Sequence, residues 1–298
     1  MFKKWFVIVV VFIVSALFLN ICFYFIYPDV SMLKKKRPKK TAIMEYREKE
    51  WQRQGKSKKI KYKWVPLSKI SPYVIKAVII AEDDKFWSHE GFDFEAIEKA
   101  IEKDIKKKRF KAGGSTISQQ LAKNLYLSLS KNPVRKLKEA ILTWRIERSL
   151  SKRRIIELYL NIAEWGDGMF GIEVAAQHYF GKHASSLTAE EAAKLAAVLP
   201  NPKRYNPTGK TRYVLNRSAR IYRIMIRRGI VISEYEEVMK EPYDVIGEDL
   251  EISEEQQEPD DKDSTDVISN GINKSEENDG RSDNPNKNPD EKQVPTFQ

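Results

Sequence analysis

Residues 113–124 read Gly-Gly-Ser-Thr-Ile-Ser-Gln-Gln-Leu-Ala-Lys-Asn. The two glycines permit backbone conformations that other residues resist, and they lead into Ser115 and Thr116, either of which can cap a helix. Such a helix start leaves free N–H groups in the first turn, where a phosphate or another anion can bind. Lys123 and Asn124 follow about two turns later. The stretch thus combines a helix start with a cation, and an ordinary loop before a helix is the alternative.

Charge is spread unevenly along the 298 residues, which carry a net charge of +11. Residues 241–298 hold 18 acidic and 5 basic side chains, net −13, whereas residues 1–240 hold 48 basic and 24 acidic ones, net +24. A body this basic predicts an anionic partner, such as nucleic acid, anionic lipid or a phosphorylated substrate. Residues 244–298 contain few large apolar side chains, so we expect a disordered acidic tail there.

The N-terminal region contains an apolar stretch from Trp5 to Tyr27 without a charged side chain. As a helix it would be about 35 Å long, enough to cross the core of a bilayer. Aromatic residues crowd both ends, as at membrane interfaces. The stretch is too long for a signal peptide, and no cleavage site of small residues follows it. We therefore expect residues 5–27 to form an uncleaved transmembrane anchor.

The charges on either side of this span give conflicting signals about its orientation. Two lysines precede it, whereas six cations follow it closely: Lys34, Lys35, Lys36, Arg37, Lys39 and Lys40. By the positive-inside rule, the larger group would place the body of the protein in the cytoplasm. The same cations can instead attract anionic lipid headgroups. We expect residues 28–62 to be a basic juxtamembrane segment and residues 63–243 to be the globular domain.

Apolar residues of the domain recur at helical spacing, and few stretches alternate with the period of a strand. The domain is therefore expected to be mainly α. Capping residues and proline mark most of the expected helix starts, which are Ser71, Asp93, Asn132, Ser151 and Thr188. A basic amphipathic helix is expected to begin at Arg212. The helix from Ser151 is expected to reach Trp165, and the helix from Arg212 to reach Arg228 before Gly229.

Three consecutive acids, Glu82 to Asp84, follow an apolar helical run. Like-charge neighbours and partial burial would raise the pKa of a carboxylate in this cluster, and this suits a general base. A solvated acidic cluster is the alternative. His89 lies close by, but a single histidine of this kind is more often structural than a ligand or a base.

A second acid, Glu139, lies on a helix that is rich in cations. Arg135 is four residues away, so an intrahelical salt bridge is the simplest interpretation. The alternative is an anion site, because arginine grips phosphate through a fork of donors and lysine supplies a point charge. Its expected members are Lys123, Lys131, Arg135 and Lys136. Two carboxylates beside such a site are typical of glycosidic chemistry.

Five segments occur in a fixed order along residues 64–230. Three of them are Glu82-Asp-x-x-Phe86-x-x-His89-x-Gly91, Gly114-Ser-Thr-Ile-Ser-Gln119-Gln120-x-x-Lys123-Asn124 and Arg135-Lys136-x-x-Glu139. The other two are Ile156-Glu-Leu-Tyr159-Leu-Asn161 and Leu187-Thr-x-x-Glu191-Ala-Ala-x-Leu195. In this order they resemble the motifs of the peptidoglycan glycosyltransferases (glycosyltransferase family 51), and in particular the monofunctional, membrane-anchored members. One departure is Ser118, where the family more often has threonine.

The resemblance implies a lysozyme-like α domain with a hydrophobic jaw that lies on the membrane. It implies a reaction that joins lipid II units into glycan strands, with inversion and release of undecaprenyl diphosphate. Glu82 would be the general base at the acceptor's 4-hydroxyl, and Glu139 would assist departure of the diphosphate. The diphosphate would be held by Lys123, Arg135 and Lys136, with help from Lys131. The other substrate-binding residues would be Ser115, Thr116, Gln119, Gln120 and Asn124.

The same resemblance implies a cellular setting. The catalytic domain would lie on the outer, periplasmic face of the bacterial cytoplasmic membrane, with residues 1–4 in the cytoplasm, against the charge rule. Expected partners are lipid II, the nascent glycan strand and membrane lipids. Other cell-wall synthesis or division proteins are further candidates, and no nucleic acid is expected. No cofactor is expected to be required, with Mg²⁺ or Mn²⁺ at Glu139 as the alternative.

Three other activities fit the sequence less well. A transpeptidase needs a Ser-x-x-Lys nucleophile and a long α/β body, and fewer than about 70 residues follow Gly229. We therefore expect no transpeptidase activity. A lytic hydrolase would not need the cations expected around a diphosphate. A membrane-tethered nucleic-acid binder would fit the basic body, but no recognised motif supports it.

Overall fold

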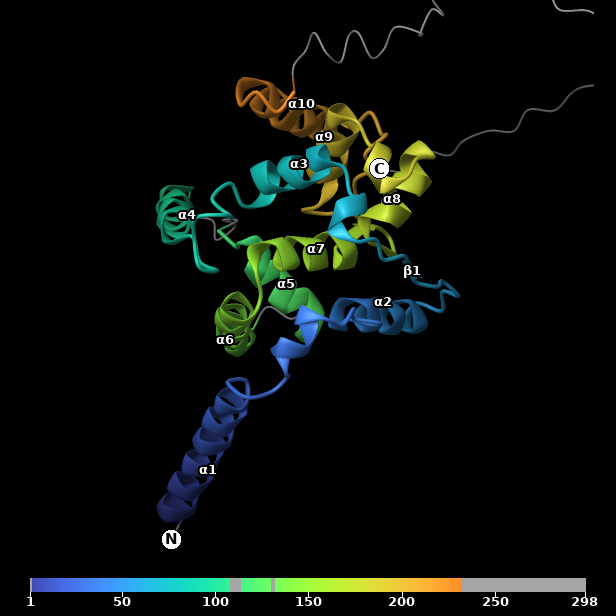
Figure 1. Ribbon diagram of the computed structural model, residues 1–298. Coiled ribbons are helices and arrows are strands. Elements are labelled where there is room, and N and C mark those ends of the chain that lie inside the picture. The colour runs from blue at the N-terminus through green and yellow to red at the C-terminus, as the bar shows by residue number, and fades with distance from the viewer. Residues whose placement is uncertain (1, 108–113, 130–131, 232–298) are drawn as a thin grey trace, which may run out of the picture. The chain divides into compact units, whose positions relative to one another are not determined.

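The structure is a computed structural model that describes residues 2–107, 114–129 and 132–231 (Figure 1). Lys131 and the acidic tail, residues 244–298, lie outside the described residues, so the predictions made for them stay predictions.

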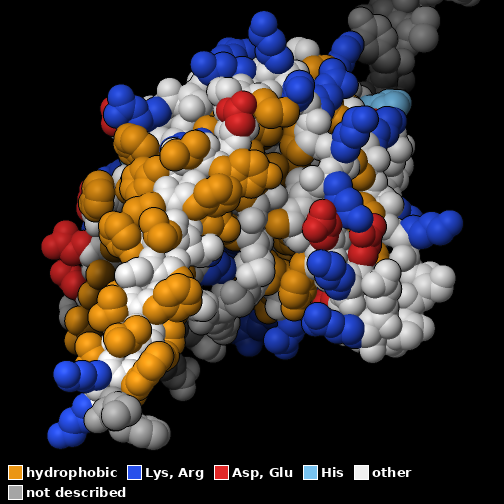
Figure 2. Space-filling view, turned by 90° about the horizontal axis from the view of Figure 1, so that it is seen from below, with side chains coloured by type: hydrophobic (Ala, Val, Ile, Leu, Met, Phe, Trp, Pro, Cys, Tyr) orange, Lys and Arg blue, Asp and Glu red, His pale blue; other side chains and the backbone are white. Residues whose placement is uncertain are grey.

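The first element is the apolar helix α1 (Phe2–Phe23), whose side chains are exposed along most of its length. Lys3–Phe23 is long and apolar enough to cross a membrane, which fits a single-pass anchor. The helix ends at Phe23 rather than at Tyr27, and residues 24–27 follow as a turn. Seen from the end where α1 projects, hydrophobic side chains gather along the helix and the adjoining surface (Figure 2).

The body is mainly helical, as the sequence predicted. Its main helices are α3 (Pro72–Glu82), α4 (Phe94–Lys107), α5 (Ile117–Tyr126), α6 (Pro133–Ser149), α7 (Lys152–Ile162), α8 (Ile172–Phe180), α9 (Ala189–Val198) and α10 (Arg212–Arg227). Side-chain caps form at predicted starts: Asn132 accepts from Val134 N, and Ser151 accepts from Arg154 N. Local capping chemistry therefore fixes where these two helices begin.

The predicted helix end at Trp165 is wrong by three residues. Helix α7 ends at Ile162, and β2 (Glu164–Gly166) begins almost at once. It pairs with β3 (Met169–Phe170), which also pairs with β1 (Lys61–Tyr62) in the order β1-β3-β2. Gly171 follows with φ +88°, and a Cβ there would lie 2.9 Å from the carbonyl oxygens of Asn161 and Lys63. The chain turns here because only glycine fits both constraints.

The segment expected to be juxtamembrane is folded against the domain. It contains the 3-10 helix η1 (Val30–Lys34) and helix α2 (Ala42–Arg53). Trp51 of α2 is 2% exposed. Arg47 of α2 forms a bidentate pair with the buried Glu164, through Nε at 2.9 Å and Nη2 at 2.7 Å to Oε2. The structured domain thus begins well before residue 63, the boundary expected from composition.

Two groups of helices form the frame around the site. Helices α3, α9 and α10 pack together, and α5 packs on α6 and α7 (Figure 1). Small side chains permit the close approach of α3 and α9, since Ala77 on α3 and Ala193 on α9 are fully buried. The end of α3 and the start of α5 meet where the two groups adjoin, and this junction holds most of the residues singled out by the sequence.

Helix α4 carries its apolar stripe on the outside of the body. Phe94, Ile101 and Ile105 are 76%, 55% and 67% exposed, and Leu137 and Trp144 of α6 are 48% and 43% exposed. Exposed apolar side chains in such numbers are typical of a surface that contacts a membrane or a partner.

Candidate active site

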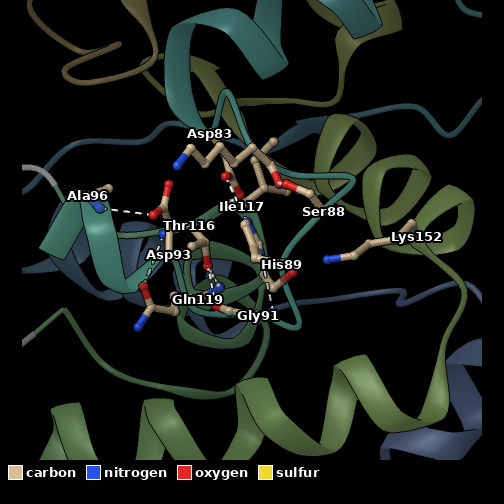
Figure 3. Close-up of polar contacts among 12 residues, drawn as sticks. Asp83, Ser88, His89, Gly91, Asp93, Ala96, Thr116, Ile117, Gln119 and Lys152 are labelled. Carbon is tan, nitrogen blue, oxygen red and sulfur yellow. Dashed lines mark hydrogen bonds and ion pairs between the residues drawn. The ribbon is translucent and has the colours of Figure 1, made fainter.

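Asp83 joins the end of α3 to the start of α5. Its Oδ2 accepts a hydrogen bond from the backbone N–H of Ile117 at 2.8 Å, and its Oδ1 lies 2.8 Å from Nε2 of His89 (Figure 3). Gly91 N donates to Nδ1 of His89 at 3.0 Å, so Nε2 carries the proton and donates to Asp83. His89 is therefore a structural histidine that holds Asp83 in place.

Thr116, and not Ser115, caps α5. Its hydroxyl accepts from Gln119 N at 3.2 Å, and the Gln119 side chain accepts from Thr116 N at 3.0 Å, which completes a capping box (Figure 3). The Thr116 hydroxyl also donates to the carbonyl oxygen of Gly91 at 2.7 Å. Since Asp83 and Thr116 take the N–H groups of Ile117 and Gln119, these are not free for a phosphate. The expectation that backbone N–H groups of the first turn bind a phosphate is therefore wrong for these two groups.

Glu82 is the last residue of α3, and its side chain is 11% exposed. Oε2 accepts from Gln120 Nε2 at 2.9 Å, and Oε1 accepts from Arg217 Nη2 at 3.1 Å. Gln120 is fixed in turn by the hydroxyl of Tyr159, which donates to it at 3.1 Å. Side chains from α5 and α10 therefore hold the carboxylate in a single orientation, and α7 supports one of them.

Burial raises the pKa of Glu82, while Gln120, Arg217 and Lys123 act in the opposite direction. The direction agrees with the expectation from sequence, and of the two expected causes burial is the main one, whereas the neighbouring acids are not among the main causes. Asp83 is occupied by His89 and Ile117, and Asp84 forms a surface pair with Arg228 at 2.6 Å and 2.8 Å. Removal of Glu82 from water is the main cause.

Glu139 lies on α6 and is only 2% exposed. Both carboxylate oxygens are paired: Arg135 Nη1 donates to Oε2, and Lys136 Nζ donates to Oε1. Lys136 Nζ also lies 3.3 Å from the Ser115 hydroxyl. The intrahelical salt bridge is thus present, and one of its cations, Lys136, also reaches Ser115 just before α5.

Lys123 of α5 interacts electrostatically with both carboxylates, Glu82 and Glu139. Burial lowers its pKa, and the cations of Arg135 and Lys136 act in the same direction, whereas Glu139 and Glu82 oppose them. Three cations and one carboxylate meet on the Glu139 side, so this cluster has an excess of positive charge that a bound anion would neutralise.

A pocket opens beside Glu82. Its lining comes from the end of α3, from Asp93 and Ala96 at the start of α4, and from Gly114 and Ser115 before α5. It therefore connects the Glu82 side of the site to the residue that contacts Lys136. Asn124 is buried on α5, 7% exposed.

The structure brings most of the predicted site residues together. Glu82 contacts Gln120, and Ser115, Arg135, Lys136 and Glu139 form a second group. Thr116 and Gln119 are close but act as the helix cap. Sequence reasoning missed Arg217 and Tyr159 as contacts around Glu82. Arg217 looked like one more basic residue of an amphipathic helix, and no local pattern separated it from the others.

The chain is similar to known proteins over most of its length. A family model described as Transglycosylase matches residues 48–226. A "Biosynthetic peptidoglycan transglycosylase" of Nitrosospira multiformis is 44% identical over 225 residues, covering 73% of this chain and 97% of that protein. Proteins of the same name from Methylobacillus flagellatus and Chromobacterium violaceum are 49% identical over 190 residues and 53% identical over 167 residues. These alignments cover 64% and 54% of this chain, and 82% and 73% of those proteins.

Proposed function

We propose that this chain, which belongs to the transglycosylase family, polymerises lipid II into glycan strands for the bacterial cell wall. The observation that carries the proposal is that two largely buried carboxylates, Glu82 and Glu139, both interact with Lys123, while two further cations are paired with Glu139. Glu82 has an environment suited to a base, and Glu139 lies among cations suited to a diphosphate. A reaction between a sugar hydroxyl and a sugar diphosphate needs both.

Glu82 acts on the acceptor in this proposal. It takes the proton of the acceptor sugar's 4-hydroxyl as that oxygen attacks the anomeric carbon of the donor, and the bond from that carbon to the diphosphate breaks with inversion. The pKa of Glu82 is raised by burial, so the carboxylate is a stronger base than one in water. Hydrogen bonds from Gln120 and Arg217 leave a lone pair on each oxygen for this proton.

The cations act on the donor. Lys123, Arg135 and Lys136 neutralise the charge that the departing undecaprenyl diphosphate gains, and preorganised electrostatic stabilisation of this kind is a large term in catalysis. Glu139 holds Arg135 and Lys136 in position. It is a single carboxylate engaged by two cations, which is a poor donor set for Mg²⁺ or Mn²⁺. We therefore propose that no metal is required.

The substrate also sets the location. Because lipid II is polymerised outside the cytoplasmic membrane, we propose that α1 crosses that membrane with its N-terminus inside and the domain on the periplasmic face. The exposed apolar side chains of α4 and α6 support contact of the domain with the bilayer. The proposed partners are lipid II, the growing strand and membrane lipids, with other cell-wall synthesis or division proteins as candidates.

Purified protein incubated with lipid II, and separately with isolated sacculi, tests the function. We expect glycan polymer without peptide cross-links from lipid II, and no soluble fragments from sacculi. Release of fragments without polymer growth would instead identify a lytic hydrolase. Salt-dependent binding to DNA without turnover of lipid II would identify a nucleic-acid binder.

Arg217 gives a prediction about pH. It is the cation that contacts Glu82 from α10, while Lys123 faces Glu82 from α5 and Tyr159 lies beyond Gln120 on α7. Burial raises the pKa of Glu82 and Arg217 opposes this, so Arg217→Ala should raise the pKa further. The base must be deprotonated to act. The acidic limb of the pH profile of polymerisation should therefore move to higher pH, with the rate recovering under alkaline conditions.

The control for this prediction is Arg228→Ala. Arg228 follows the same helix and pairs with the neighbouring Asp84, but it does not contact Glu82 in the structure. Its pH profile should match that of the wild type. A profile of Arg217→Ala that falls equally at every pH would assign Arg217 to structure or to substrate binding instead.

A further inference from the structure

Residues 24–36, which we call the collar, connect α1 to the body. Arg145 of α6 donates from Nη1 to the carbonyl oxygen of Tyr24 at 2.8 Å and from Nη2 to that of Ile26 at 2.7 Å. Carbonyls at a helix C-terminus lack partners within the helix. The planar fork of one arginine thus binds the chain at the point where it leaves α1.

Two further contacts join the collar to the same helix. The ammonium group of Lys138 lies 4.7 Å above the ring of Tyr24. The rings of Phe25 and Trp144 meet edge to face, with centroids 6.2 Å apart. Helix α6 therefore contacts the collar through three side chains, spread over about two turns.

A second arginine fixes the other end of the collar. Arg154 of α7 donates to the carbonyl oxygens of Leu33 at 2.8 Å and Lys36 at 2.9 Å. Val30 and Leu33 are 3% and 7% exposed and belong to the main hydrophobic core. Backbone hydrogen bonds at both ends and buried side chains between them make the collar part of the fold rather than a loose tether.

Helix α6 also carries the residues assigned to the diphosphate. Arg135 and Arg145 are ten residues apart, or about 15 Å along one helix. A lipid-linked diphosphate lies at the level of the headgroups, so the distance from the bilayer to Arg135 decides whether the two can meet. An error of about 1 Å in such an alignment can cost about a hundred-fold in rate.

We propose that Arg145 is a positioning residue, which locks α1 to α6 and so sets the depth of the donor site relative to the membrane. The proposal rests on the proposed function, since it concerns how a lipid-linked substrate reaches the cations. It assigns Arg145 no contact with the substrate. A positioning role of this kind matters only when the substrate is held in a membrane. A role in the chemistry would matter with or without one.

The test is Arg145→Ala, assayed with lipid II in two settings. In bilayer vesicles we expect turnover to fall by about ten- to a hundred-fold. In detergent, with a short-chain lipid II analogue that diffuses freely, we expect activity close to the wild type, because no bilayer fixes the substrate. Arg145→Lys keeps the charge but loses the fork. In vesicles its turnover should lie between that of the wild type and that of Arg145→Ala.

Arg153→Ala is the matched control, because Arg153 is an exposed arginine of α7 next to Arg154. It should match the wild type in both assays. An equal loss for Arg145→Ala in detergent and in vesicles would overturn the proposal, and so would full activity in vesicles. If the wild type polymerises lipid II in neither assay, the proposed function itself fails.

A second measurement does not depend on activity. Spin labels at Asn20→Cys in α1 and Glu190→Cys in α9, in a Cys22→Ser background, report the distance between anchor and body in vesicles. Both labelled positions are exposed. We expect a narrow distance distribution with Arg145 present and a broad one with Arg145→Ala. A narrow distribution in both would show that Arg145 does not hold the anchor.

Discussion

Glu82→Gln should lower kcat for lipid II polymerisation by about 10²–10⁴-fold, the usual contribution of a general base. Glutamine has nearly the same shape, and its amide oxygen can still accept a hydrogen bond, but it cannot take up the proton of the acceptor. Lipid II should still bind, because the cations around Glu139 are unchanged. The measurement is the initial rate of polymer formation at saturating lipid II.

The stability of the same variant gives an independent check. Burial raises the pKa of Glu82, so at neutral pH the charged form costs stability relative to a neutral side chain. That cost arises as the pH rises above the carboxyl's unfolded pKa. Glu82→Gln should therefore unfold at the same temperature as the wild type or at a higher one. If Glu82→Gln is inactive but at least as stable as the wild type, Glu82 serves catalysis at a cost in stability.

Asp84→Asn is the control for this prediction. Asp84 is the second acid after Glu82 and is half-exposed, where it pairs with Arg228. Its loss should leave the polymerisation rate unchanged. If Glu82→Gln kept its full rate at neutral pH, Glu82 would not be the base, and Glu139 would become the candidate for the proton transfer.

The sequence predicted those parts of the fold that depend on neighbouring residues. Asn132 and Ser151 cap their helices within three residues, so local chemistry decides these starts. The choice between Ser115 and Thr116 was open for the same reason, because both can cap. Asp83 decides it by binding the N–H of Ile117 from 34 residues away. Ser115 thereby remains beside Lys136 in the site.

Contacts between distant segments account for what the sequence could not predict. Arg47 and Glu164 are separated by 117 residues and Arg217 and Glu82 by 135. When an arginine and its acidic partner are this far apart in the sequence, no local sequence pattern indicates that they form a pair. Residues 28–62 are so rich in cations that their composition predicts a polar linker. The few side chains that pack on the domain, such as the buried Trp51, do not change that composition.

Arg135→Ala is expected to have the second largest effect, a fall in kcat of about 10²–10³-fold, comparable to the loss of one preorganised donor in other enzymes. Charge on the diphosphate grows as its bond to the sugar breaks. The guanidinium fork should therefore bind the departing group more tightly than the intact donor, and most of the loss should appear in kcat rather than in KM. Steady-state kinetics with lipid II measure the two separately.

Two further variants sharpen this last prediction. Arg135→Lys keeps the charge but lacks the fork, so it should recover only part of the rate. Arg148→Ala removes an arginine from the last turn of the same helix, where it stacks on Trp144 away from Glu139, and should leave kcat unchanged. A rise in KM for Arg135→Ala with kcat intact would contradict the assignment. In that case Arg135 would hold the donor equally before and during the reaction, and Lys123 and Lys136 would have to supply the stabilisation of the departing diphosphate.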